Sequence, residues 1–244
     1  MNLIVDVGNT KIKLAVFDDG KVLDHKTCLL QDFEESVELL LNSFPELSHA
    51  IVAAVGKFSE DSLKVLQDRF QTYQLTQNSS IPFINQYGSP NTLGVDRLAL
   101  VSAAALQFPE QHVLVIDAGS CITYDFLTKK NKYLGGAISP GIAMRYKALK
   151  TFTDKLPLLQ AKHPKTFIGN TTEDSMHVGV VEGVLNEIEG FIAMYEENFG
   201  GLKIILTGGD AHFLRDSIKN DIFANSNFLL EGLNHILEIN KSSC

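Results

Sequence analysis

The chain has 244 residues, of which 45% are hydrophobic and 20% charged, so it can bury a substantial core and is not a disordered chain. Its formal net charge of −8 argues against a general binder of nucleic acid or of anionic membranes, which needs a basic face. The 3 cysteines are widely spaced and predict neither a disulfide framework nor a zinc site, which favours a cytoplasmic protein. We expect no signal peptide, and no apolar run reaches the ~18 residues that a membrane helix needs.

A strand–turn–strand hairpin is predicted over residues 3–17. An apolar run ends at Asp6, Gly8 permits a tight turn, and apolar residues then alternate with polar ones in the returning strand. The carboxylate of Asp6 suits Mg²⁺, and backbone amides beside Lys11 suit phosphates. The hairpin alone leaves two interpretations open, a phosphate-binding turn and an ordinary polar turn.

A third strand is predicted at 22–29, followed by a helix at 33–44, a strand at 50–56 and a helix at 61–70. Residues 72–84 can be strand or loop, and a glycine-rich loop at 85–97 leads into an apolar helix at 98–106. Asp96 and Arg97 stand at this junction. They can be catalytic side chains held by the helix, or a helix-terminal charge and an ion pair.

Residues 113–127 repeat the pattern of the opening hairpin. An apolar strand again ends in Asp117, a glycine and the hydroxyl of Ser120 follow, and an alternating strand returns. This internal duplication at about half the chain length predicts two related halves, residues 1–112 and 113–244. Two carboxylates at corresponding strand ends can converge on one metal–phosphate group, which favours a functional interpretation of both hairpins.

The second half continues with a strand at 133–142, a helix at 143–152 and a long helix that ends near residue 198. A buried strand at 203–206 leads into Thr207-Gly208-Gly209-Asp210-Ala211, where two glycines can expose backbone amides to a ligand or simply form a tight turn. A short strand near Phe223 and an amphipathic helix at 228–237 complete the predicted elements.

Three phosphate-type turns in this order resemble the actin/hexokinase/sugar-kinase superfamily, whose two ribonuclease-H-like halves close over ATP and Mg²⁺. The motifs between them are similar to type III pantothenate kinase over residues 2–237. The resemblance rests on Asp6-Val7-Gly8-Asn9-Thr10, Tyr87 with Gly94-Val95-Asp96-Arg97, Gly135-Gly136-Ala137-Ile138-Ser139-Pro140-Gly141, Ala148-Leu149 to Leu156-Pro157, Asn170-Thr171-Thr172 before Ser175-Met176, and Thr207-Gly208-Gly209-Asp210-Ala211. The fold it implies is α/β, with two βββαβα domains and a nucleotide cleft.

The resemblance implies ATP-dependent phosphorylation of pantothenate to 4'-phosphopantothenate, the first step of coenzyme A biosynthesis, in a cytoplasmic homodimer. Asp96 would be the general base, Asp6 would lie near Mg²⁺, and Asp117 would hold a monovalent cation, K⁺ or NH₄⁺. The ATP-binding residues would be Asp6, Val7, Gly8, Asn9, Thr10, Lys11, Ile12, Lys13, Ser120, Gly208 and Gly209. The substrate-binding residues would be Tyr87, Gly94, Val95, Asp96, Arg97 and Thr172. Neither nucleic acid nor a membrane is an expected partner.

The chain departs from the family pattern at two places. Ser120-Cys121 stands where the family usually has threonine and a small residue, and residues 52–56 lack a proline often found there. Cys121 can be a buried small hydrophobe or a redox-sensitive thiol. Two alternatives to pantothenate kinase are a non-catalytic regulator on the same fold and another small-molecule kinase. The presence of Asp6, Asp96 and Asp117 favours an enzyme, and the loop at 87–97 favours pantothenate.

Overall fold

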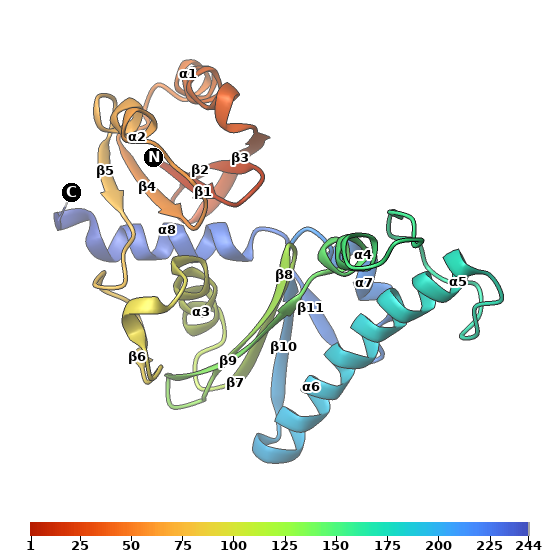
Figure 1. Cartoon of the computed structure of the whole chain (residues 1–244). Coiled ribbons are helices and arrows are strands. Elements are labelled where there is room, and N and C mark those ends of the chain that lie inside the picture. The colour runs from red at the N-terminus through yellow and green to blue at the C-terminus, as the bar shows by residue number, and fades with distance from the viewer. Residues whose placement is uncertain (244) are drawn as a thin grey trace. The chain divides into compact units, whose positions relative to one another are not determined.

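The computed structural model describes residues 1–243, which form two compact units (Figure 1). Unit 1 comprises residues 1–109, 131–133 and the described part of 227–244, and unit 2 comprises residues 110–130 and 134–226. The sequence predicts one boundary after residue 112, whereas in the structure the chain passes between the two units at several points. Among the described residues, no helix is long and apolar enough to cross a membrane.

Unit 1 is built on a five-stranded sheet in the order β3-β2-β1-β4-β5. The predicted hairpin forms β1 (Asn2–Val7) and β2 (Ile12–Asp18), and β3 (Lys21–Cys28) continues the antiparallel meander. β4 (His49–Ala54) lies parallel to β1, and β5 (Gln71–Gln74) lies parallel to β4. β1 is buried along its whole length, because helices cover both faces of the sheet at this strand.

The helices of unit 1 divide between the two faces of this sheet. α1 (Phe33–Ser43) and α2 (Glu60–Gln67) pack on the face that carries the odd-numbered side chains of β1. α8 (Phe228–Asn240) contacts β1 and β4 from the other face and packs against α3 (Val95–Gln107). The shorter elements of this unit are η1 (Leu30–Asp32), β6 (Ile84–Asn85), η2 (Pro90–Thr92) and η5 (Lys241–Ser243).

Unit 2 repeats the strand order of unit 1, which confirms the predicted duplication. Its strands lie in the order β9-β8-β7-β10-β11, with β7 antiparallel to β8 and parallel to β10. The strands are β7 (His112–Ala118), β8 (Cys121–Leu127), β9 (Lys132–Pro140), β10 (Leu202–Thr207) and β11 (Ile222–Ala224). The first two residues of β9 belong to unit 1, where they pair with β6.

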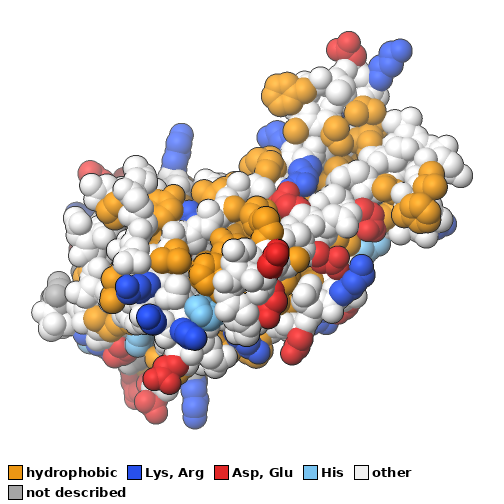
Figure 2. Space-filling model, turned by 90° about the horizontal axis from the view of Figure 1, so that it is seen from below, with side chains coloured by type: hydrophobic (Ala, Val, Ile, Leu, Met, Phe, Trp, Pro, Cys, Tyr) orange, Lys and Arg blue, Asp and Glu red, His pale blue; other side chains and the backbone are white. Residues whose placement is uncertain are grey.

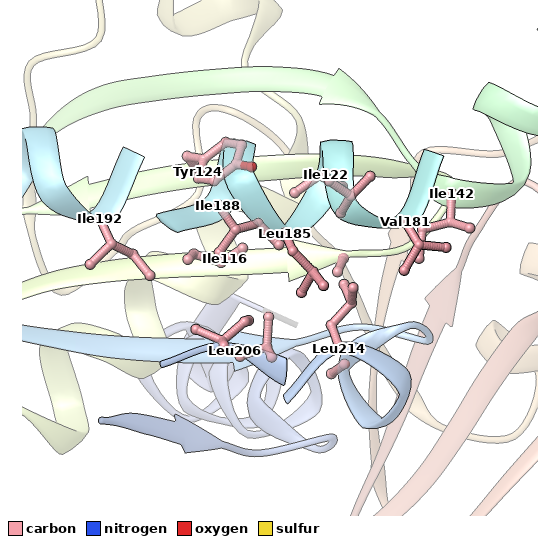
Figure 3. Packing of buried hydrophobic residues seen from close by; sticks show 14 of the residues in the cluster. Ile116, Ile122, Tyr124, Ile142, Val181, Leu185, Ile188, Ile192, Leu206 and Leu214 are labelled. Atoms are coloured by element: carbon pink, nitrogen blue, oxygen red, sulfur yellow. The ribbon is translucent and has the colours of Figure 1, made fainter. Parts of the chain in front are cut away.

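The core of unit 2 forms where helices pack on the central strands of this sheet. Side chains of β7, β8 and β10 meet the helical run that includes Leu185, Ile188 and Ile192 (Figure 3). The helices of the unit are α4 (Ile142–Thr151), α5 (Thr172–His177), η3 (Val178–Glu182), α6 (Gly183–Phe199), α7 (Ala211–Leu214) and η4 (Arg215–Ser217).

Two predicted boundaries differ from the structure. α3 begins at Val95 rather than at residue 98, so Asp96 and Arg97 lie in its first turn instead of in the preceding loop. The long helix predicted to end near residue 198 is interrupted by the π-helical turn η3, which separates α5 from α6. The apolar spacing runs through η3 without a break, so the side-chain pattern gives no sign of the altered backbone hydrogen bonding.

Candidate active site

The β1–β2 turn of unit 1 is held by hydrogen bonds from two directions. The Gly8 N–H donates to the Lys11 carbonyl at 3.1 Å, which closes the turn. The backbone N–H groups of Val55 and Gly56 both donate to the Val7 carbonyl, each at 3.1 Å. A Cβ on Gly56 would lie 2.3 Å from the Gly8 carbonyl oxygen, so only glycine permits this approach. The segment after β4 therefore supports the predicted phosphate-binding turn.

Asp6 is a buried carboxylate at the end of β1. Burial raises the pKa of its side chain to about 6, against the opposing effect of Lys13 and with a further upward contribution from the Asp96 carboxylate. The Lys13 ammonium lies 3.8 Å from the Asp6 carboxylate, too far for a direct hydrogen bond. Unit 1 therefore brings the two predicted acids, Asp6 and Asp96, within electrostatic reach of each other.

Asp96 is fixed by the first turn of α3. Its Oδ1 accepts a hydrogen bond from the Arg97 backbone N–H at 2.8 Å, and its negative charge is favourable at the helix N-terminus. A Cβ on Gly94 would lie 2.3 Å from this same oxygen, so the glycine leaves the space that the carboxylate occupies. In this position Asp96 can be both a favourable charge at the helix N-terminus and a catalytic carboxylate, the two roles that the sequence left open.

Arg97 and Tyr87 lie together in unit 1, as their joint assignment to a substrate pocket requires. The Arg97 guanidinium is buried and its Cζ lies 5.5 Å from the centroid of the Tyr87 ring, within the range of a cation–π interaction. Tyr87 in turn stacks on Tyr133, with the ring centroids 6.0 Å apart. These aromatic contacts restrict the orientation of the buried Arg97 guanidinium.

In unit 2, the second and third predicted turns meet at the carboxyl ends of β7 and β10. Asp117 is paired in register with Thr207, and the Asp210 N–H donates to the Ala118 carbonyl at 2.9 Å. Gly208 has a φ of +95°, and a Cβ there would lie 2.3 Å from both the Ala118 carbonyl oxygen and an Asp117 carboxylate oxygen. A glycine is therefore needed for this turn to pack against Asp117.

The turn that carries Ser120 is buttressed by the start of α4. The Gly141 N–H donates to the Ser120 carbonyl at 3.1 Å, and a Cβ on Gly141 would lie 1.9 Å from the Gly119 carbonyl oxygen. Unit 2 thus brings Asp117, the Ser120 turn and Gly208 together through backbone contacts. Gly209 follows Gly208 directly, and a Cβ at this position would meet nothing within 4 Å.

Thr172 lies elsewhere in unit 2, at the start of α5, on a cavity of about 1090 Å³. The neighbouring Thr171 caps this helix by accepting a hydrogen bond from the Asp174 N–H at 3.1 Å. The cavity combines an apolar wall with hydroxyl, amide and guanidinium groups. It is lined by Arg145, Ala148, Leu149, Phe152, Thr153, Leu156, Gly169, Asn170, Thr171, Thr172, Ser175, Met176, Gly179 and Val180.

Arg145 and Glu187 form a polar cluster beside this cavity that sequence reasoning missed. Arg145 donates to the Pro140 carbonyl at 2.8 Å and to Glu187 at 2.5 Å. Burial opposes ionisation of Glu187, but hydrogen bonds from Ser139, Arg145 and Tyr124 together hold its pKa below the usual range. A lone arginine and a glutamate on two predicted helices carry no local signal that they will meet.

Asp6 and Asp117, the acidic residues at the two strand ends, suit cations that bind to only a few protein ligands. Among the described residues, no group of three or more His, Cys, Asp or Glu side chains could hold a metal ion. Mg²⁺ commonly uses one or two carboxylates together with substrate phosphates and water. Asp6, a buried carboxylate whose pKa is raised, is a suitable donor of this kind, and an Asp117 carboxylate oxygen and the Ala118 carbonyl oxygen both lie beside Gly208.

Comparison with solved structures agrees with the fold. A solved Baf-family protein from Campylobacter jejuni, described as a transcriptional activator, matches with a TM-score of 0.65 at 24% identity and covers 98% of this chain and 99% of that one. A ROK-family glucokinase from Streptomyces griseus, solved with glucose and AMPPNP, matches with a TM-score of 0.55 at 11% identity over 99% of both chains. These two likenesses show the two-domain α/β fold of the sugar-kinase type.

Sequence similarity is more specific. The type III pantothenate kinase from Flavobacterium johnsoniae is 48% identical over 233 residues, which cover 96% of this chain and 96% of that protein. The family model described as type III pantothenate kinase matches residues 2–194. The chain therefore belongs to the type III pantothenate kinase family.

Proposed function

We propose that the chain phosphorylates pantothenate with Asp96 as the general base. Type III pantothenate kinases are ATP-dependent kinases that phosphorylate pantothenate in coenzyme A biosynthesis, and this chain is a member. The observation that carries the proposed role is the position of Asp96, fixed in the first turn of α3 and within electrostatic reach of Asp6. A fixed carboxylate near a phosphate-binding turn suits the acceptance of a proton from an attacking hydroxyl.

In the proposed reaction, the primary hydroxyl oxygen of pantothenate forms a bond to the γ-phosphorus of ATP. The bond between that phosphorus and the β–γ bridging oxygen breaks, ADP leaves, and the hydroxyl proton passes to the Asp96 carboxylate. Phosphoryl transfer of this kind depends mostly on positioning and charge neutralisation. Arg97 supports this scheme as a buried cation, which can bind the pantothenate carboxylate or hold Asp96 in place.

The remaining site residues keep the roles that the sequence suggests. We assign pantothenate contacts to Tyr87, Gly94, Val95, Asp96, Arg97 and Thr172. We assign ATP contacts to the turn from Asp6 to Lys13 in unit 1 and to Ser120, Gly208 and Gly209 in unit 2. The close backbone packing at Gly56 and Gly208 supports these turns as rigid, preformed supports for phosphate groups.

Two cations complete the proposal. Asp6 would hold Mg²⁺ and Asp117 a monovalent ion, K⁺ or NH₄⁺, which would neutralise phosphate charge when bound. We further propose that the enzyme works in the cytoplasm, a reducing compartment that suits the free thiols of Cys28 and Cys121.

We also propose that the protein is a homodimer. Unit 2 exposes large hydrophobic side chains, some of them on or near the segment that follows α4, and Figure 2 shows hydrophobic side chains at several places on the surface. These exposed residues of unit 2 include Ile138, Met144, Phe152, Leu158, Phe167 and Ile168, with Phe152 at 85% and Phe167 at 81% exposure. An apolar surface of this kind is typical of a contact between protein chains.

The test is a kinase assay on the purified full chain with ATP, Mg²⁺ and K⁺ against pantothenate and a small panel of sugars. We expect product only with pantothenate, and turnover of a sugar instead would contradict the substrate assignment. Asp96→Asn should lower kcat by ~10²–10⁴ while ATP binding, measured by calorimetry, stays unchanged. A near-normal kcat for Asp96→Asn would remove its role as the base. Asp61→Asn, an exposed change at the start of α2, serves as the matched control.

A further inference from the structure

A small cavity beside the β1–β2 turn is reached by a lysine from a separate segment of unit 1. The cavity has a volume of about 300 Å³, near the lower end of the range for small-ligand sites. Its lining consists of the turn itself, one leucine from η1 and one residue that follows β4. These residues are Val7, Gly8, Asn9, Thr10, Lys11, Ile12, Leu30 and Lys57.

The backbone determines that Lys57 lies at this turn. The N–H groups of Val55 and Gly56 donate to the Val7 carbonyl, and the Gly56 Cα packs so closely on Gly8 that a side chain would not fit. Lys57 is the next residue, so its side chain begins at a point fixed against the turn. Lys57 directly follows residues 52–56, the segment that lacks the proline often found in the family.

The charge of the cavity is one-sided. Lys11 and Lys57 are its two cations, Asn9 and Thr10 are neutral hydrogen-bonding groups, and its other lining residues are apolar or glycine. Lys57 is exposed and forms no ion pair with any residue between 1 and 243. Its ammonium is therefore available to an anion, and a turn with two lysines and backbone amides favours phosphate oxygens.

We propose that Lys57 is a phosphate-binding residue for ATP, acting together with the β1–β2 turn. The inference rests on the proposed assignment of that turn to ATP, and it adds a contact that lies outside the turn. The ligand class is the polyphosphate chain of a nucleoside triphosphate. An ammonium group interacts with the negative charge of the phosphates and not with the nucleobase. Lys57 should therefore strengthen binding of ATP and of free tripolyphosphate alike.

The test is isothermal calorimetry of ATP and of inorganic tripolyphosphate binding to the full chain, with steady-state kinetics alongside. Lys57→Ala should raise the Kd for both ligands and the KM for ATP by about 5- to 20-fold, leaving the KM for pantothenate unchanged. Lys57→Arg should restore most of the affinity. Lys64→Ala, which removes an exposed lysine of the nearby helix α2, should change none of these values.

Thr10→Ala, a change in the turn itself, separates this inference from the proposed function. If Thr10→Ala weakens ATP binding and Lys57→Ala does not, Lys57 has no phosphate role and the ATP assignment of the turn stands. If neither change weakens binding in an active kinase, the turn is not the phosphate site and both proposals fail. An equal loss with Lys57→Ala and Lys64→Ala would show only a general charge effect and would also overturn the inference.

Discussion

Asp6 combines a cost in folding stability with a proposed role in Mg²⁺ binding. The strand that carries it is buried, and burial raises its pKa to about 6, so at neutral pH the folded chain holds a poorly solvated negative charge. The nearest cation, Lys13, is 3.8 Å away and 42% exposed, so it compensates this charge incompletely. A bound divalent cation would supply the missing compensation.

Asp6→Asn should therefore stabilise the protein in the absence of nucleotide and Mg²⁺. Because the pKa of Asp6 is raised on folding, the folded state binds the extra proton between about pH 4 and 6, and stability decreases as pH rises through this window. We expect the variant to be more stable by roughly 1 to 3 kcal/mol at pH 7.5, a difference that vanishes near pH 4. Calorimetric unfolding at several pH values measures it.

Asp18→Asn is the control, since Asp18 is exposed at the end of β2 and its loss should leave the pH dependence of unfolding unchanged. Equal stability of wild type and Asp6→Asn at pH 7.5 would mean that the Asp6 carboxylate is better solvated or compensated than its burial implies. The same raised pKa predicts that any Mg²⁺-induced increase in melting temperature is lost as pH falls below about 6.

At the scale of elements, close backbone contacts hold each unit together at particular glycines. α8 packs on α3 through Gly232, where a Cβ would lie 1.9 Å from the Ala99 carbonyl oxygen. Gly190, in contrast, is an exposed glycine of α6 with nothing within 4 Å of a built Cβ. The two positions have the same residue in the same kind of element but opposite surroundings.

We expect Gly232→Ala and Gly190→Ala to have opposite effects on thermal stability. Gly232→Ala forces α8 away from α3 and should lower stability by at least about 1–3 kcal/mol, the usual cost of overpacking. Gly190→Ala removes a poor helix former without a clash and should raise stability by up to ~1 kcal/mol. The measurement is a comparison of the melting temperatures of the two variants with that of the wild type. A Gly232→Ala variant more stable than the wild type would show that α8 does not pack on α3 as described.

Much of this element structure was predictable from the sequence. Apolar runs that end in Asp6 and Asp117 predicted the central strands, and the repeat of the hairpin pattern predicted the shared strand order of the two units. The start of α3 was missed because Gly94 and Val95 resemble the loop before them and give no helical period. The π turn η3 was missed because it alters backbone hydrogen bonds and leaves the apolar spacing intact.

The candidate site was predictable in part for a related reason. Asp96 and Asp6 belong to recognisable motifs. Lys57, in contrast, lies at the turn only because Gly56 packs against Gly8, and these two glycines are 48 positions apart in the chain (from residue 8 to residue 56). Glu187 likewise meets Arg145 only after α4 and α6 have packed on one sheet. Tertiary neighbours of this kind leave no pattern in a single sequence.

At the scale of the whole molecule, the oligomeric state can be tested directly. If the exposed hydrophobic residues of unit 2 form the proposed dimer contact, the molecular mass measured by sedimentation should be twice the 26.9 kDa of one chain. Phe167→Glu should then yield a monomer, because a buried charge without a partner opposes association. Leu39→Glu, at a side chain that is 48% exposed on α1, should remain dimeric. A monomeric wild type would contradict the proposal.

The assignment of α8 to unit 1 has a consequence for the order of folding during synthesis. β1 is the first strand made, yet its face toward α8 is completed only by the last helix, through hydrogen bonds from Asn2 to Asn234 and Glu238 at 2.7 Å each. The whole of unit 2, which ends at Ser226, is translated between these two events. Synthesis of unit 2 is thus finished before unit 1 has the helix that covers one side of β1.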